Sequence, residues 1–301
     1  MGFAPKIFCC LEGWKGVDCP HFDGVAPMSP LYLRSRGWIL AAIVCLTWQI
    51  FAVASDDPTL TKEQIKQFLL TAKVVSSRPA AKGVTHTLRL TLSDGNVTHD
   101  ASFQPIDEHT PSKQFVTGTV LNFVDSYKYN IAAYELSELL GMDDMLPVYV
   151  ERKWAGQVGS LSWWLPVKMD EAQRYKQKLE PPDQDAWNNQ MYKIRVFDQL
   201  VSDSDPNLTN VLIGEDWKIW RIDFTRAFRL TTDLKDPTKN LVRCDRQLLE
   251  KLKALDANAL TEKTKQYLTK EEVKTVMARR DKIVAYFQKL IAEKGENEVL
   301  Y

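Results

Sequence analysis

The sequence predicts an α+β protein with two lobes, a small antiparallel β lobe that carries one helix and a larger lobe that is mainly helical. Alternating apolar and polar residues, separated by turn residues, indicate β-hairpins in the first half of the chain. Helical periodicity dominates later, above all at 185–201 and 269–294. Because the pattern changes after Pro166, we expect the small lobe at 55–166 and the helical lobe at 167–301.

The overall charge excludes one broad class of partner. The chain has 39 Lys and Arg against 39 Asp and Glu, which gives a formal charge of zero. Without a basic field to attract a phosphate backbone, we expect no nucleic-acid binding. Four of the five cysteines lie in the first 45 residues without the spacing of a zinc site, and Cys244 follows alone. If the N-terminus is removed, a disulfide within the chain is therefore impossible.

The N-terminal region has the organisation of a secretory signal. Met28 begins a short region with Arg34 and Arg36, an apolar run follows at 38–51, and a small-x-small pattern ends at Ala54. We therefore expect that the signal starts at Met28 and is cleaved after Ala54.

The alternative for residues 1–54 is an N-terminal extension that ends in a membrane anchor at 38–54. The apolar run is short for a bilayer span and includes Thr47 and Gln49, which favours cleavage over anchoring. Both interpretations place the globular part outside the cytoplasm, periplasmic, secreted or in the lumen of a secretory pathway. Membrane contact would come only from this N-terminal segment, if it is not cleaved.

The elements of the small lobe follow from local patterns. Residues 58–73 predict a helix, because apolar residues recur at helical spacing and Thr59 or Thr61 can cap it. Residues 83–104 predict a hairpin that turns through an Asp-Gly pair. Residues 107–122 are polar and lack periodicity, so we expect a loop there.

Two more hairpins and several helices complete the lobes. Residues 127–140 predict a helix that Gly141 closes, and residues 146–165 predict the second hairpin. A helix at 185–201 then precedes a third hairpin with short apolar strands. From Asp245 onward the pattern is helical and ends in the long amphipathic helix.

The third hairpin, formed by residues 211–213 and 219–224, connects three oxygen-bearing side chains. Asp205 and Asn210 precede it and Asp223 lies in its last strand. Because a hairpin joins its two ends, we expect these side chains to converge. Two carboxylates and an amide oxygen are hard ligands that suit Mg²⁺ and leave room for phosphate oxygens. The sequence therefore predicts a site for a metal and a phosphate group.

This combination of elements resembles the protein-kinase-like superfamily. The resemblance covers residues 59–300 and is strongest in its spacing, since Asn210 follows Asp205 by 5 residues and Asp223 follows it by 18. The local sequence is more similar to the atypical branch, which includes phosphatidylinositol 3-/4-kinases, HipA-type toxin kinases and the secretory-pathway kinases of the Golgi.

The resemblance implies a role for each residue. Asp205 would orient or deprotonate the acceptor hydroxyl. Asn210 and Asp223 would hold Mg²⁺ or Mn²⁺ ions that bridge the phosphates of ATP or another nucleoside triphosphate. Glu135 would be the helix carboxylate that pairs with a strand lysine, and residues 161–165 would lead into the hinge beside the adenine ring.

The sequence also departs from the family pattern. Gln104 occupies the strand position where the family has its phosphate-binding lysine, and an amide donates a hydrogen bond without neutralising charge. Lys128 lies seven residues before Glu135 on the same helix face and is a candidate substitute. Residues 80–83 offer one glycine instead of a glycine-rich run, and Thr225 replaces the glycine after Asp-Phe.

The hypothesis that follows is an exported phosphotransferase that acts on a hydroxyl of a protein, a lipid or a sugar. The alternatives are a kinase-fold binding module without catalysis and transfer of a nucleotidyl group on the same fold. Arg226 and Arg229 follow Asp223 and can meet a phosphate, but we favour an ordinary ion-paired or solvated position for them.

Overall fold

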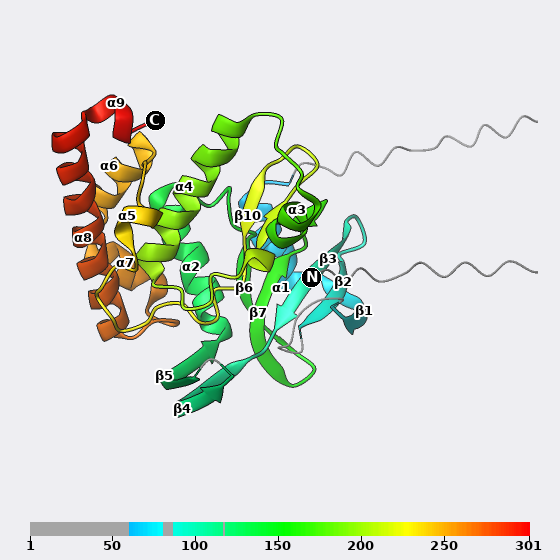
Figure 1. Cartoon of the computed structure of the whole chain (residues 1–301). Coiled ribbons are helices and arrows are strands. Elements are labelled where there is room, and N and C mark those ends of the chain that lie inside the picture. The colour runs from blue at the N-terminus through cyan, green and yellow to red at the C-terminus, as the bar shows by residue number, and fades with distance from the viewer. Residues whose placement is uncertain (1–59, 81–86, 117) are drawn as a thin grey trace, which may run out of the picture. The chain divides into compact units, whose positions relative to one another are not determined.

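The computed structural model describes residues 60–80, 87–116 and 118–301. These residues form an antiparallel sheet lobe and a helical lobe, which confirms the predicted α+β class (Figure 1). The expected signal segment at 28–54 and most of the loop at 80–83 lie outside the described residues.

A five-stranded antiparallel sheet forms the small lobe. In spatial order its strands are β1 (Lys73–Pro79), β2 (Leu88–Ser93), β3 (Thr98–Gln104), β7 (Gln157–Trp163) and β6 (Tyr149–Trp154). Alternate side chains of β2 and β3, among them Leu90 and Phe103, are fully buried. These strands confirm the two hairpins predicted for this lobe, and β1 is an additional edge strand.

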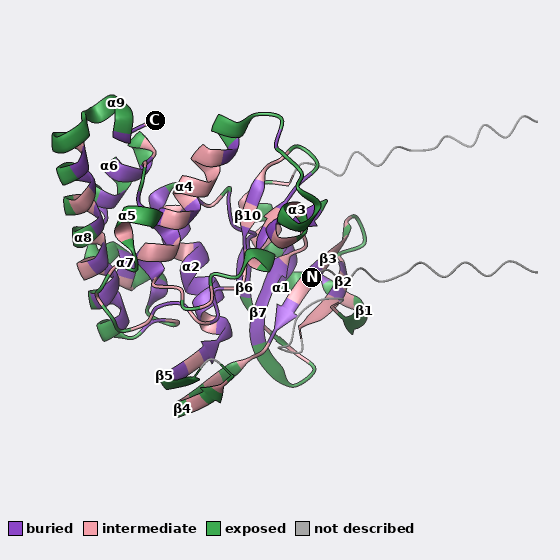
Figure 2. Cartoon of the chain, in the orientation of Figure 1, coloured by how far each residue is buried: buried purple, intermediate pink, exposed green. Residues whose placement is uncertain are grey.

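Two helices pack against this sheet. The first, α1 (Lys62–Thr71), begins at a capping box in which Thr61 and Gln64 exchange hydrogen bonds. The second, α2 (Tyr127–Leu140), ends where Gly141 adopts a left-handed φ of +66°, as its sequence predicts. Ten of the 14 residues of α2 are buried, because it contacts the sheet on one side and helices on the other (Figure 2).

The prediction of a loop at 107–122 is wrong. These residues belong to a two-stranded ribbon of β4 (Asp107–Phe115) and β5 (Gly118–Ser126), which projects from the small lobe (Figure 1). The ribbon packs little of its surface against the core, so both of its faces carry polar side chains. A strand without a buried face has no apolar alternation, and its sequence therefore has the character of a loop.

The third predicted hairpin is present as β9 (Val211–Ile213) and β10 (Ile219–Arg221). It is joined by the short strand β8 (Met169–Asp170), and α3 (Glu171–Gln177) follows that strand. The 3-10 turn η1 (Leu208–Asn210) leads directly into β9. The hairpin therefore lies between the sheet lobe and the helices.

Helices make up the rest of the second lobe. They are α4 (Gln184–Val201), α5 (Pro237–Asn240), α6 (Arg246–Ala254), α7 (Ala257–Thr264), α8 (Lys270–Lys294) and α9 (Glu296–Val299). The long helix α8 packs against α4, α6 and α7 through buried residues such as Val276, Ile283 and Phe287. The predicted helices at 185–201 and 269–294 are thus confirmed to within a residue at each end.

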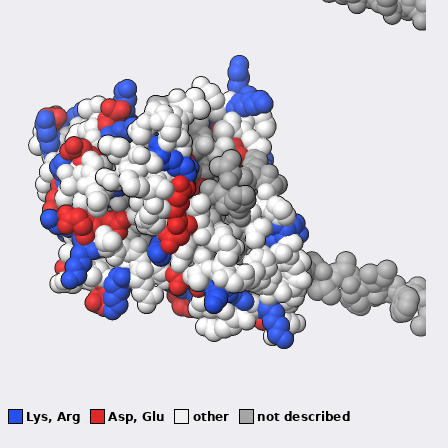
Figure 3. Space-filling view, turned by 90° about the horizontal axis from the view of Figure 1, so that it is seen from below, with Lys and Arg blue, Asp and Glu red and all other residues white. Residues whose placement is uncertain are grey.

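The surface agrees with the neutral composition. Acidic and basic side chains are interspersed over the face drawn in Figure 3. Within the described part of the chain, none of the helices is both long and apolar enough to cross a membrane.

A buried arginine of α8 ties the core of the helical lobe together. Arg279 donates to the carbonyl oxygens of Leu200, Arg229 and Thr231 at 2.7, 2.8 and 2.5 Å. We predict that Arg279→Met lowers the free energy of unfolding by about 2–4 kcal/mol, because three carbonyls lose their donor. Urea denaturation measures this change.

The control is Lys274→Met on the same helix. The Lys274 side chain is exposed and paired only with Glu271, so we expect a change within about 0.5 kcal/mol. Equal effects of the two substitutions would contradict the structural role of Arg279.

Candidate functional site

The loop between α4 and β9 carries Asp205 and Asn210. Ser202 ends α4 with a left-handed φ of +49° and turns the chain into this loop. Asn207 then caps η1 by accepting a backbone N–H with its side chain at 3.0 Å. Local turn chemistry therefore sets the course of the loop.

Main-chain hydrogen bonding brings Asn210 to the segment that carries Asp223. The carbonyl oxygen of Asn210 accepts the N–H of Ile222 at 3.0 Å. Asn210 is thus bonded to the residue directly before Asp223. The two ends of the hairpin are therefore joined through their main chains.

Asp223 is partly buried and has an unusual backbone conformation. Its φ is +61°, a value that residues other than glycine adopt rarely and mostly at constrained sites. Its carboxylate accepts the hydroxyl of Thr225 at 3.1 Å and lies 3.5 Å from the amide nitrogen of Gln104. Desolvation raises the pKa of Asp223, and the negative charge of nearby Asp125 raises it further.

Gln104 lies at the end of β3 and pairs with Asn130 of α2. The Asn130 amide nitrogen donates to Gln104 Oε1 at 2.8 Å and to Ser160 Oγ at 3.3 Å. The Asn130 amide oxygen accepts the N–H of Phe224 at 2.7 Å. One carboxamide therefore connects β3, α2, β7 and the segment that holds Asp223. No motif in the sequence indicated Asn130.

The structure corrects the expected placement of Glu135 and Lys128. Glu135 lies 3.7 Å from Lys66 and 3.2 Å from Lys263, and Lys128 lies 2.8 Å from Asp107. At about 100° per residue, both positions point about 140–160° away from Asn130, the residue of α2 that faces Gln104. Neither side chain therefore lies beside the strand.

Arg226 joins Asp205 to a further carboxylate. Its Nη1 lies 3.0 Å from Asp205 Oδ2, and its Nε lies 3.0 Å from Asp125 Oδ2. The Asp205 side chain is 45% exposed, whereas Asp125 is buried and its Oδ1 has no hydrogen-bond partner in the described part of the chain. Asp205 thus remains accessible to an acceptor, and Asp125 keeps one buried oxygen without a partner among the described residues.

A buried cluster of three charged side chains packs against the loop that carries Asp205. The Arg221 guanidinium is 1% exposed and contacts both Asp203 and Asp198, the latter at 3.2 Å. Asp203 also accepts the N–H of Asp205 at 3.0 Å, so the cluster positions the loop directly. Burial raises the pKa of both carboxyls, that of Asp203 to about 6, and the attraction of Arg221 opposes this shift. Sequence reasoning missed all three residues.

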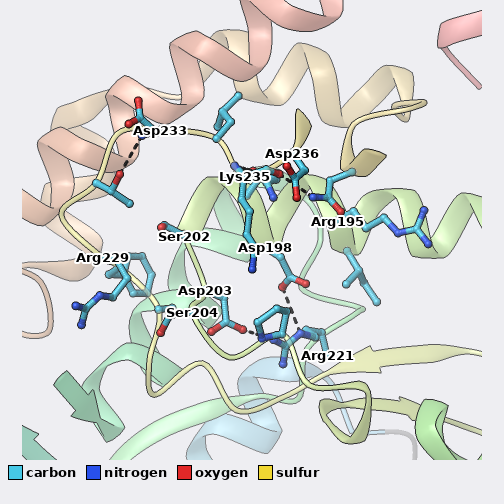
Figure 4. A pocket seen from close by; sticks show the side chains of 18 of the residues that line it. Arg195, Asp198, Ser202, Asp203, Ser204, Arg221, Arg229, Asp233, Lys235 and Asp236 are labelled. Atoms are coloured by element: carbon cyan, nitrogen blue, oxygen red, sulfur yellow. Dashed lines mark hydrogen bonds and ion pairs between the residues drawn. The ribbon is translucent and has the colours of Figure 1, made fainter. Parts of the chain in front are cut away.

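A cavity of 1020 Å³ lies next to this cluster (Figure 4). Its walls come from α4, from the loop at 202–208 and from the segment 227–240. Lys235 points into it toward Asp198, while Arg195 and Arg229 point away (Figure 4). Gln104, Asn130 and Asp223 do not line it.

Among the described residues, no three His, Cys, Asp or Glu side chains form a group that could hold a metal ion. The chemistry of the site nevertheless fits a divalent cation. The charge of Asp125 acts on Asp223, and the Oδ1 of Asp125 has no hydrogen-bond partner in the described part of the chain. Asn210 is bonded through its main chain to the residue before Asp223. A cation here would complete its coordination with oxygens of a bound ligand.

No protein-family model and no curated protein sequence matches this chain. Among solved structures, the chain is similar to the crystal structure of a Helicobacter pylori proinflammatory kinase, CtkA. The TM-score is 0.48 and the sequence identity 10%, over 74% of this chain and 97% of that chain.

Asn130 generates a prediction about stability. Asn130→Ala leaves the Phe224 N–H and Gln104 Oε1 buried without their partner. We expect the free energy of unfolding to fall by about 2–3 kcal/mol. Ser137→Ala, a buried position on the same helix whose hydroxyl bonds only to the carbonyl of Tyr134, should change it by about 1 kcal/mol or less. An Asn130 variant as stable as the Ser137 variant would refute the connecting role.

Asp203 generates a prediction about pH. A raised pKa means that the folded state binds the proton more tightly, so this carboxyl stabilises the fold at low pH and the contribution is lost as pH rises through about 6. Relative to Asp203→Asn, the wild type should therefore gain about 1 kcal/mol between pH 7 and pH 5. Urea unfolding at both pH values measures this difference, and Asp233→Asn, an exposed carboxylate, gives the baseline. A gain in the opposite direction would contradict the raised pKa.

Proposed function

We propose that this protein is a kinase-like phosphotransferase. It moves a phosphoryl group from a nucleoside triphosphate, ATP in the first instance, to a hydroxyl of a protein, lipid or sugar. The observation that carries the proposal is the placement of Asp205, Asn210 and Asp223 at the two ends of one hairpin, with Asp205 accessible and Asp223 influenced by the charge of Asp125. Phosphoryl transfer needs positioning and charge neutralisation more than covalent help from the protein. This group of residues would position the reactants and hold a divalent cation that would supply the positive charge.

Each residue has a role in this proposal. Asp205 orients the acceptor hydroxyl and takes its proton. Asn210 and Asp223 hold Mg²⁺ or Mn²⁺, with the free oxygen of Asp125 close by. The metal, when bound, neutralises charge on the nucleotide phosphates. Gln104 donates a hydrogen bond to a phosphate oxygen from the end of β3.

A second candidate is a kinase-fold binding module without catalysis. The observation that favours it is the neutral amide pair of Gln104 and Asn130, which contributes hydrogen bonds and no positive charge. The two candidates differ in whether a bound nucleotide is consumed. Export of the protein is also a proposal, and it depends on the signal-like pattern of residues 28–54.

Substitutions of Asp223 and Asp205 should affect nucleotide binding and phosphoryl transfer differently. With Mg²⁺ and ATP at about 100 times the dissociation constant, the full-length chain should gain about 2.7 kcal/mol in stability, seen as a higher melting temperature. We predict that Asp223→Ala abolishes this metal-dependent gain. Asp205→Ala should keep the gain and lower the transfer rate about 10²–10⁴-fold.

Asp233→Ala, an exposed carboxylate of the same lobe, is the control and should leave both measurements unchanged. A metal-dependent gain that survives Asp223→Ala would rule out the proposed metal site. Nucleotide binding without any turnover would support the binding module instead, and the mass of the product distinguishes phosphoryl from nucleotidyl transfer.

A further inference from the structure

Arg226 is tied to the Asp205 loop by both its main chain and its side chain. Its carbonyl oxygen accepts the Ser204 hydroxyl at 2.9 Å, and its guanidinium contacts Asp205 and Asp125 at 3.0 Å each. These contacts fix its backbone three residues beyond Asp223. The Arg226 guanidinium therefore lies next to Asp205, the carboxylate that the proposed function assigns to the acceptor hydroxyl.

The Arg226 guanidinium packs near two aromatic rings and still has N–H groups without a partner among the described residues. Its Cζ lies 5.6 Å from the Phe115 ring and 5.5 Å from the Phe123 ring, both in the β4–β5 ribbon. The side chain remains 24% exposed. Nε and Nη1 make its two ion pairs, and Nη2 makes no hydrogen bond to the described residues. A guanidinium has five N–H donors, so several are available to a ligand.

Two other cations of this region, Arg221 and Lys128, are already paired. Arg221 is enclosed with Asp198 and Asp203, and Lys128 is paired with Asp107. Gln104 brings no charge to the strand position. Arg226 thus combines direct contact with Asp205, partial exposure and unused donors.

We propose that Arg226 supplies to the transferred phosphoryl group the positive charge that this chain lacks at Gln104. This inference rests on the proposed function and adds a residue to it. In the reaction, the bond between the terminal phosphorus and the bridging oxygen of the nucleoside triphosphate breaks, and a bond to the acceptor oxygen forms. The nucleoside diphosphate leaves with the electron pair of the broken bond, and Asp205 takes the acceptor proton.

The two ion pairs of Arg226 allow one part of its guanidinium to stay fixed while the other contacts the phosphoryl group. Asp125 holds Nε, while the Nη edge is shared with Asp205 in the absence of a ligand. A phosphoryl group offers that edge three oxygens, a better match for a planar fork of donors than one carboxylate oxygen. Moving the Nη edge to the phosphoryl group also releases Asp205 to accept the proton.

The test compares binding of Mg²⁺–ADP with and without aluminium fluoride, which mimics the transferred group, by calorimetry on the full-length chain. The wild type should bind at least about tenfold more tightly with aluminium fluoride. Arg226→Gln should lose most of this gain, while its affinity for Mg²⁺–ADP alone changes by less than about threefold.

Two further variants keep the test decisive. Lys113→Gln removes a cation that lies 4.4 Å from the same Phe123 ring but is paired with Glu108, and it should behave as wild type. If Arg226→Gln does not fold, Arg226→Lys keeps the charge and loses the fork, and it should retain an intermediate gain.

The outcomes separate this inference from the proposed function. If the wild type binds Mg²⁺–ADP but gains nothing from aluminium fluoride, or if Arg226→Gln keeps the whole gain, the inference is wrong and the nucleotide site stands. If the wild type binds no nucleotide, the proposed function fails and this inference fails with it.

Discussion

The candidate site depends on the hydrogen bonds of one buried carboxamide. Asn130 donates to Gln104 and accepts from Phe224, so it fixes the end of β3 and the residue after Asp223 to the same helix. These groups come from segments up to 120 residues apart in the sequence, and each would be costly to leave unpaired in the interior. The sheet, α2 and the hairpin therefore keep one relative position, and the left-handed conformation of Asp223 is retained.

The electrostatic balance of the site follows from this arrangement. Asp125 and Asp223 bring two negative groups close together, and desolvation makes that proximity unfavourable unless a cation compensates. Arg226 compensates part of the charge through Asp125, while the Gln104–Asn130 pair contributes none. The site is thus short of positive charge on the Asp223 side, which favours a bound cation and limits what an anionic ligand gains from the strand.

Much of the fold could be predicted because its elements have one buried face. The helix 127–140, its closing Gly141 and the hairpin before Asp223 all follow from periodicity and turn chemistry. Asn130 could not be found in this way, because a single amide among apolar helix residues has no distinctive pattern. The β4–β5 ribbon was missed because β4 and the first five residues of β5 have no buried side chains. Arg221 was missed because its partners Asp198 and Asp203 meet it only in three dimensions.

The β4–β5 ribbon provides several of the contacts that hold Arg226 in place. It supplies Asp125 and both rings beside Arg226, and its two strands pair only with each other. A two-stranded ribbon is marginally stable by itself, so its local opening costs less free energy than global unfolding. Local opening of the ribbon would therefore release Arg226 from Asp125 and from both rings.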